Sequence, residues 1–153
     1  MNNLSRPIHG LMIAGILAVA STFAVNAQDL DRSDDVKMLG NCEGCVFDKQ
    51  DFSERRLMGI DLASAQLSNI TFDRAAMNIA IFDGASLRNV SFVGTDLSGA
   101  SFVGSQLIDV SFDGADLNGA VFEGAILVRT DLQSAQLCNT QTLGDTMDNS
   151  DCG

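Results

Sequence analysis

The chain has 153 residues, of which 46% are hydrophobic and 19% charged, a balance typical of one globular domain. Its formal net charge of -11 comes from 20 acidic residues against 9 Lys and Arg. Nucleic acids and anionic membranes attract basic surfaces, so this composition argues against nucleic-acid binding and against attachment to such a membrane.

The N-terminal segment, residues 1–27, has the order of a secretory signal peptide. Arg6 and His9 precede an apolar run, which ends at the small residue Ala27 before the polar Gln28. The run is short for a bilayer span, which needs roughly 20 residues. We therefore expect cleavage between Ala27 and Gln28, no stable membrane insertion afterwards, and export to a bacterial periplasm or the extracellular space. An uncleaved anchor is the alternative.

A large apolar residue returns at every fifth position from Phe47 to Leu137, which makes 19 consecutive repeats. Five steps turn an α-helix by about 500°, so such a stripe would wander around the helix. On one continuous strand, successive members of the series would point to opposite faces. The period therefore predicts short extended segments with a corner in each repeat, so that every central residue points inward.

Two further positions of each repeat fit this interpretation. Two places before the central residue stands a small residue, which the two-residue period of a strand also turns inward: Ala75, Ala80, Ala85, Val90, Thr95, Ala100, Ser105, Val110, Ala115, Ala120 and Ala125. Two places after it stands a residue that tolerates the positive φ of a tight turn: Gly84, Gly94, Gly99, Gly104, Gly114, Gly119 and Gly124, with Asn69 and Asn89 at equivalent points.

The segments "TDLSG" (residues 95–99), "ASFVG" (100–104) and "ADLNG" (115–119) resemble the motif of the pentapeptide-repeat family. The resemblance covers about two thirds of the chain. It implies an all-β fold with a single domain, a right-handed quadrilateral β-helix in which four repeats form one square coil. The chain would then hold somewhat under five coils, about 23 Å tall at a strand spacing of roughly 4.8 Å.

In such a coil, positions twenty residues apart stack into four interior columns. Two columns of phenylalanine are expected to face each other, and leucine and methionine fill the other two. The columns are Phe72, Phe92 and Phe112; Phe82, Phe102 and Phe122; Leu67, Leu87, Leu107 and Leu127; and Met77, Leu97, Leu117 and Leu137.

The expected boundaries are a leader and N-terminal cap at residues 28–44, which contains Cys42, the repeats at 45–139, and a C-terminal cap at 140–153. In the stack that the resemblance implies, Cys42 and Cys45 lie at one end and Cys138 and Cys152 at the other. A disulfide requires Cα atoms within about 7 Å, so the expected bonds are Cys42–Cys45 and Cys138–Cys152. Both cysteine-bearing segments resemble those of some exported relatives.

The segment "CEGC" (residues 42–45) also matches the Cys-x-x-Cys motif, which leaves periplasmic redox activity as an alternative. Glu43 would raise the thiol pKa, however, and nothing in the chain resembles a thioredoxin-like fold. The single histidine, His9, leaves zinc, haem attachment and a Ser-His-Asp triad without a ligand or base. We expect no cofactor, no metal site and no catalytic residues. Asp96 and Asp116 would stack on an outer wall as a solvated acidic face.

Two functions remain. The first is a rigid scaffold for a protein partner or for self-association, because apolar residues that the motif does not require point outward: Ile81, Val103 and Val121 on one wall, and Ile108, Ile126 and Val128 on the next. The second is acidic mimicry, because some cytosolic members of the family resemble duplex DNA and occupy DNA gyrase. That alternative would use Asp51, Asp73, Asp113 and Asp131, which share one wall. The expected export counts against it.

Overall fold

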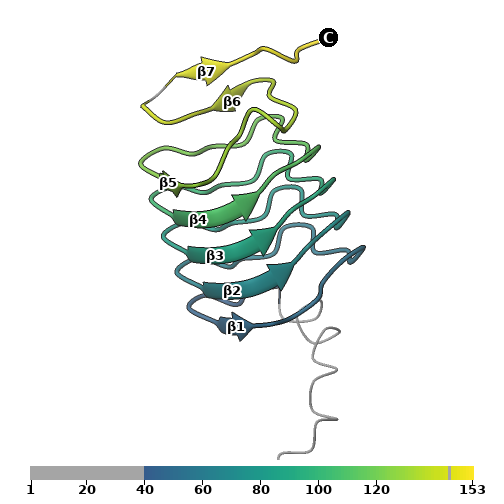
Figure 1. Ribbon diagram of the computed structural model, residues 1–153, viewed down its shortest axis with the longest axis vertical. Helices are drawn as coiled ribbons and strands as arrows, with labels where there is room; N and C mark the ends of the chain where they lie inside the picture. The colour runs from purple at the N-terminus through teal and green to yellow at the C-terminus, as the bar shows by residue number, and fades with distance from the viewer. Residues whose placement is uncertain (1–39, 145) are drawn as a thin grey trace, which may run out of the picture.

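The computed structural model describes residues 40–144 and 146–153. The expected signal peptide, its cleavage site at Ala27 and Gln28, and the leader as far as residue 39 lie outside the described residues. Within them, every regular element is a strand and the chain winds upward as a β-solenoid (Figure 1). The expected all-β quadrilateral β-helix is confirmed.

One wall of the solenoid is a five-stranded parallel sheet in the order β1-β2-β3-β4-β5. Its strands are β1 (Val46–Asp48), β2 (Gln66–Thr71), β3 (Ser86–Ser91), β4 (Gln106–Ser111) and β5 (Ile126–Val128). Each paired residue lies beside the residue twenty positions later, on the next strand, as in the series Leu67, Leu87, Leu107 and Leu127. A second, antiparallel sheet of β6 (Thr140–Gln141) and β7 (Met147–Asp148) lies at the C-terminal end.

The other three walls have the same offset of twenty residues between paired positions, but they contain no long strands. The four walls are numbered in the order in which the chain forms them. Wall 1 is the five-stranded sheet. Walls 2, 3 and 4 contain the columns of Phe92, Leu97 and Phe102, and isolated parallel bridges such as Asp96↔Asp116 and Ser101↔Val121 join their coils. This offset places four repeats in one coil, as the resemblance implies.

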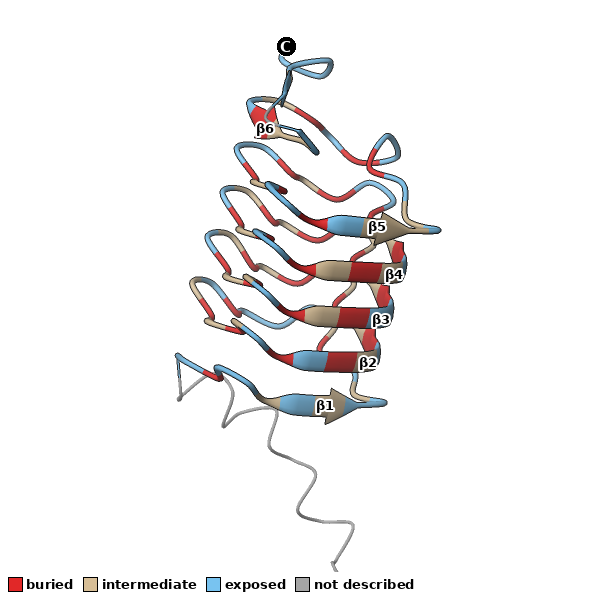
Figure 2. Ribbon diagram, turned by 90° about the vertical axis from the view of Figure 1, so that its left-hand side faces the viewer, coloured by how far each residue is buried: buried red, intermediate tan, exposed pale blue. Residues whose placement is uncertain are grey.

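The interior is filled by the predicted columns. Rings twenty residues apart stack almost parallel, with centroids 5.2 Å apart for Phe72 and Phe92 and 4.8 Å apart for Phe82 and Phe102. The two phenylalanine columns meet edge to face, at 6.2 Å and 83° between Phe92 and Phe102. Figure 2 shows buried residues alternating with exposed ones around each coil. One column departs from expectation: Leu127 is only half-buried, because no strand of the described residues follows β5 in the sheet.

Buried hydroxyl groups replace alanine at some inward positions. Thr95, Ser105 and Thr140 are fully buried, and each hydroxyl donates to a backbone carbonyl at 2.7 or 2.8 Å. Among the described residues, no buried side-chain nitrogen or oxygen lacks a hydrogen-bond partner. The small polar residues therefore fit the core, because their polar groups are satisfied locally.

The corners have the positive φ that the sequence indicates, with Gly94, Gly99 and Gly104 at 63°, 65° and 63°. The corner after wall 1 has no glycine and is built of larger residues: Lys49, Asn69, Asn89, Asp109 and Arg129, with φ between 49° and 56°. Their side chains form a polar ladder. The Asn89 amide donates to Asn69 Oδ1 at 2.8 Å, and Asn69 donates to Asp48 Oδ1 at 2.8 Å.

The solenoid is longer at both ends than residues 45–139. Asn41 bridges to Asp61, and the Cys42 N–H donates to the Asp61 carbonyl at 2.6 Å. Cys42 therefore occupies the central position of a repeat, where it is 8% exposed. At the other end, Gln141 bridges to Val121. Asn41 and Cys42, at the end of the expected N-terminal cap, are thus part of the first coil.

Candidate interaction surface

The two disulfides close the two ends of the coil. Cys42 is bonded to Cys45, with a Cα–Cα distance of 5.4 Å, and Cys138 is bonded to Cys152, with a distance of 4.9 Å. The pairing is the one expected from the stacked coils. The bond between Cys42 and Cys45 joins a central position to the inward small-residue position of the next repeat. It therefore takes the place of apolar side chains at the bottom of the core.

The C-terminal tail replaces part of a further coil. In the coils below, the Leu117 N–H donates to the Gln136 carbonyl at 3.1 Å. At the last coil, the Leu137 N–H instead donates to Asp151 Oδ2 at 2.9 Å, and the Asn139 N–H donates to Asn149 Oδ1 at 2.9 Å. The disulfide at Cys138 holds these acceptors against wall 3.

The apolar residues that the sequence singles out separate into two groups. We call Ile108, Ile126 and Val128 the apolar strip. These three residues lie together on the outer faces of β4 and β5, because Ile108 pairs with Val128 in the register of the sheet. Ile126 is 56% exposed, and the other two are half-buried.

The three residues expected on wall 4 are less continuous. Ser101 stands between Ile81 and Val121 in the column of bridges. Val103 is 36% exposed, and its backbone N–H donates to Asp83 Oδ1 at 3.1 Å. Wall 4 therefore offers separate apolar side chains beside the apolar strip rather than one patch.

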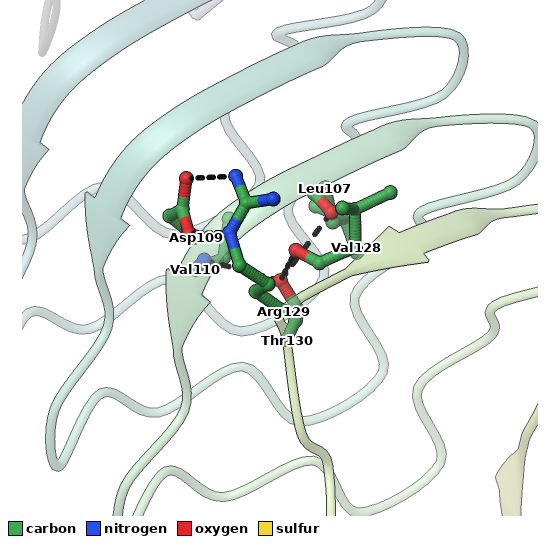
Figure 3. Close-up of polar contacts among 6 residues, drawn as sticks. All are labelled: Leu107, Asp109, Val110, Val128, Arg129 and Thr130. Carbon is green, nitrogen blue, oxygen red and sulfur yellow. Dashed lines mark hydrogen bonds and ion pairs between the residues drawn. The ribbon is translucent and has the colours of Figure 1, made fainter.

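A bare backbone corner joins walls 4 and 1. A Cβ atom on Gly124 would lie 3.9 Å from the Cα of Gly104, and both glycines have positive φ. Without side chains at this corner, a partner surface can reach Val103 and Ile126 around the same edge. The other end of β5 is fixed by polar contacts (Figure 3), since the Arg129 guanidinium donates to both oxygens of Asp109 at 2.5 and 2.6 Å.

The acidic residues lie where the repeat register predicts, but several serve the fold. On wall 2, Asp51 accepts from the Ser53 N–H and Asp73 accepts from the Val93 N–H. Hydrogen bonds from Ser53 lower the pKa of Asp51 from its ordinary value. Asp113 and Asp131 are exposed on the same wall.

Asp96 and Asp116 pair in register on wall 3, and each accepts from the backbone two residues later: Asp96 from the Ser98 N–H at 3.1 Å and Asp116 from the Asn118 N–H at 2.9 Å. The described residues contain no group of His, Cys, Asp and Glu that could hold a metal ion. These two carboxylates therefore cap local turns.

Several exposed apolar residues were missed by the sequence reasoning: Val46, Met58, Ile79, Leu143 and Met147. Val46 and Met58 flank central residues, so the same outward-position test would have found them. Ile79 occupies the corner position and has φ 55°, which a β-branched residue rarely adopts. Leu143 and Met147 lie in the tail, where the five-residue register no longer assigns an inside and an outside.

Within residues 40–144 and 146–153, no helix is long and apolar enough to span a membrane. The described part also has no helix whose N-terminus could activate Cys42, which is bonded to Cys45.

Comparison with known proteins agrees with this geometry. A family model for pentapeptide repeats matches residues 80–117 and 105–140. The crystal structure of HetL, a pentapeptide-repeat protein involved in heterocyst differentiation regulation in the cyanobacterium Nostoc sp. strain PCC 7120, is 27% identical with a TM-score of 0.66. The similarity covers 71% of this chain and 51% of HetL, so the chain spans about half the length of that relative.

A pentapeptide-repeat protein from the Arabidopsis thaliana thylakoid lumen has the same fold, with 22% identity, a TM-score of 0.58, and coverage of 65% of this chain and 70% of that one. No curated protein sequence matches the chain significantly. The fold, the repeat register and the family model lead to one conclusion. The chain belongs to the pentapeptide-repeat family.

Proposed function

We propose that this chain is an exported, non-catalytic scaffold whose apolar strip binds a protein partner. The pentapeptide-repeat fold supports a structural or interaction role, and proteins of this family are generally non-catalytic scaffolds. The observation that carries the proposal is the group of Ile108, Ile126 and Val128 on the outer face of the sheet. The motif does not require these residues, and removing them from water favours association.

The walls suit a rigid interface. The strip lies on two hydrogen-bonded strands, whose inward side chains Leu107 and Leu127 belong to the core or pack against it. Binding would therefore cost little conformational entropy on this side of the interface, because the surface is already ordered. A low cost of this kind raises the affinity for a given contact area. Export is supported by the leader pattern and by the two disulfides, because such bonds persist in oxidising compartments.

Site-specific photo-crosslinking tests the strip. A photo-reactive residue is placed at Ile126 and, as a matched control, at Asn118, which is exposed on wall 3. We expect one defined crosslinked protein from position 126 in the host cell envelope and none from position 118. Equal yields at both positions would contradict the proposal, and a product with twice the mass of the chain would show that the partner is a second copy.

The variant Ile108→Asp/Ile126→Asp supplies the energetic test. A charge at the centre of an apolar interface is left unpaired, so the affinity for the crosslinked partner should fall by at least about tenfold. Asn118→Asp adds a charge outside the strip and should leave the affinity within about twofold. Acidic mimicry makes a different prediction, since a leader-deleted chain would then inhibit DNA supercoiling by gyrase whether or not the strip is altered.

A further inference from the structure

Within the described residues, the C-terminal end of the solenoid is covered on only two of its four walls. The tail supplies acceptors to wall 3 through Asp151 and Asn149, and wall 4 is closed by the Thr142 N–H, which donates to the Thr146 carbonyl at 2.8 Å. Figure 1 shows the tail crossing above the last coil while β5 ends the five-stranded sheet. In the part of the chain that the structure describes, walls 1 and 2 therefore end in an open edge.

The open edge has unused backbone donors. In the wall 2 column, the Phe52, Phe72 and Phe92 N–H groups donate to carbonyls of the next coil at 2.7, 2.8 and 2.9 Å. The equivalent N–H groups of Phe112 and Leu132 have no acceptor among the described residues, and of the two only Leu132 lies in the last coil. Likewise, β5 is the last strand of the sheet, and no described strand pairs with its free edge. A strand edge with free N–H groups is a template for one more strand.

A groove of about 470 Å³ lies beside this edge. Leucine side chains from the last coil and the tail make it partly apolar, and two carboxylates stand on its sides. It is lined by Leu127, Thr130, Asp131, Leu132, Gln133, Leu137, Thr142, Leu143 and Asp148. None of these lining residues is basic, so the groove favours a cationic occupant.

Neighbouring contacts hold the groove in shape without neutralising it. Arg129, which adjoins the lining residue Thr130, is paired with Asp109 at the corner after wall 1 (Figure 3). The Thr130 hydroxyl accepts from the Val110 N–H at 3.1 Å. Hydrogen bonds from Ser150 lower the pKa of Asp148, so this carboxylate is charged at neutral pH.

We propose that this end groove binds an extended segment of a partner polypeptide, which adds a strand to the β5 and Leu132 edge. An apolar side chain of the segment packs against Leu127 and Leu132, and a Lys or Arg side chain pairs with Asp131 or Asp148. A second copy fits less well, because it would bring the same carboxylates against each other. The groove residue Leu127 points inward from β5, whereas the apolar strip lies on the outer face of β4 and β5, so variants of either site leave the side chains of the other unchanged.

A defined peptide pair tests the charge complementarity. The probes are the fluorescent hexapeptide KVLVKT and its acidic counterpart EVLVET, titrated into the disulfide-bonded chain by fluorescence anisotropy. We expect KVLVKT to bind with a Kd below about 1 mM and EVLVET to bind at least about tenfold more weakly. No binding of KVLVKT in that range would overturn the proposal.

Variants locate the site. Asp131→Asn/Asp148→Asn removes both groove carboxylates and keeps side-chain oxygens that can accept from Gln133 and Ser150. Asp113→Asn/Glu123→Gln removes the same charge from exposed positions outside the groove. The first variant should weaken KVLVKT binding by about tenfold and the second by less than about twofold. Equal weakening would mean that only the net charge matters and would overturn the proposal.

Hydrogen exchange tests whether the peptide adds a strand, because purely electrostatic binding would not protect backbone amides at the edge. The Leu127 and Leu132 amides should exchange rapidly in the free chain and be protected when KVLVKT is bound, because a strand then accepts from them. Binding without that protection would contradict strand addition. Sedimentation that shows a dimer, with these amides protected in the absence of peptide, would assign the edge to a second copy and also overturn the proposal.

Discussion

At the scale of single residues, Ile79 combines features that oppose each other. It is β-branched, its φ is 55°, and its side chain is 59% exposed. In the same corner column stand Gly59, Gly99 and Asn139, which tolerate the left-handed region more easily. The strain is therefore local to Ile79, and the exposed side chain recovers little of it by burial.

Ile79→Asn should raise the free energy of unfolding by about 1 kcal/mol, because asparagine adopts a positive φ at lower energy. Ile108→Asn is the matched control on an ordinary strand, where the same change should lower that free energy by about 0.5 to 1 kcal/mol. Equilibrium unfolding in urea measures both. Destabilisation of the two variants by equal amounts would show that φ strain at Ile79 is absent.

The Asp109–Arg129 pair makes a prediction about pH. The hydrogen bond from Arg129 lowers the pKa of Asp109, and the carboxylate in turn raises the pKa of Arg129. Arg129→Gln should therefore return the pKa of Asp109 toward its ordinary value of 3.8. Titration of the Asp109 carboxyl carbon by NMR measures the change.

The sign of the linked stability follows from the depressed pKa. The contribution of the pair is present above the unfolded pKa of Asp109 and is lost as the pH falls through its lower folded value. The stability difference between the chain and Arg129→Gln should therefore shrink below about pH 4. A difference that stays constant down to pH 2 would contradict the assigned cause.

At the scale of structural elements, the phenylalanine columns hold the coils together. Phe102 is fully buried, stacks on Phe82 and Phe122 at 4.8 Å, and meets Phe92 edge to face. Phe47 is also a central residue, at the start of the wall 1 column below Leu67, but it is only half-buried. A central residue therefore contributes most where it has a coil above and below.

Phe102→Ala should lower the free energy of unfolding by about 3 to 5 kcal/mol, because it leaves a cavity in a packed interior. Phe47→Ala should lower it by less than about half of that amount, since water already reaches the site. Urea unfolding of the two variants compares them under one set of conditions. A larger effect at Phe47 would show that the first coil, and not the middle of the stack, determines stability.

The two disulfides should differ in their effects. Cys138 and Cys152 are 14 residues apart, so the chain-entropy model gives a contribution of about 3 kcal/mol. Cys42 and Cys45 are 3 residues apart and close a much smaller loop. Cys138→Ser/Cys152→Ser should therefore destabilise the chain more than Cys42→Ala/Cys45→Ala, as measured by thermal unfolding. The reverse order would show that packing at the N-terminal cap outweighs the entropy of the longer loop.

The five-residue period was enough to predict the columns and corners, because each position in the repeat has one direction to face. Cys42 was not recognised as a central residue, since the series was defined by large apolar side chains. The acceptors Asp151 and Asn149 could not be predicted, because the tail leaves the repeat and reaches Leu137 and Asn139 only through tertiary contacts. The partial exposure of Leu127 depended on where the sheet ends.

At the scale of the whole molecule, the solenoid joins a filled interior to two closures of different kinds. The first coil is closed by the Cys42–Cys45 bond within its own register, whereas the last is half-closed by the tail that Cys138 and Cys152 anchor. An acidic chain of net charge -11 resists non-specific association, so binding concentrates on apolar or complementary sites. Both the apolar strip and the end groove are of this type.

Both closures depend on disulfides, so the proposed function requires the chain to reach an oxidising compartment and to meet its partner there. Intact-mass spectrometry of the chain expressed with its own leader, alkylated before and after reduction, tests this most directly. We expect a mass beginning at Gln28, no alkylation before reduction, and alkylation of Cys42, Cys45, Cys138 and Cys152 after it. An unprocessed chain whose four cysteines are alkylated without reduction would rule out export and disulfide closure.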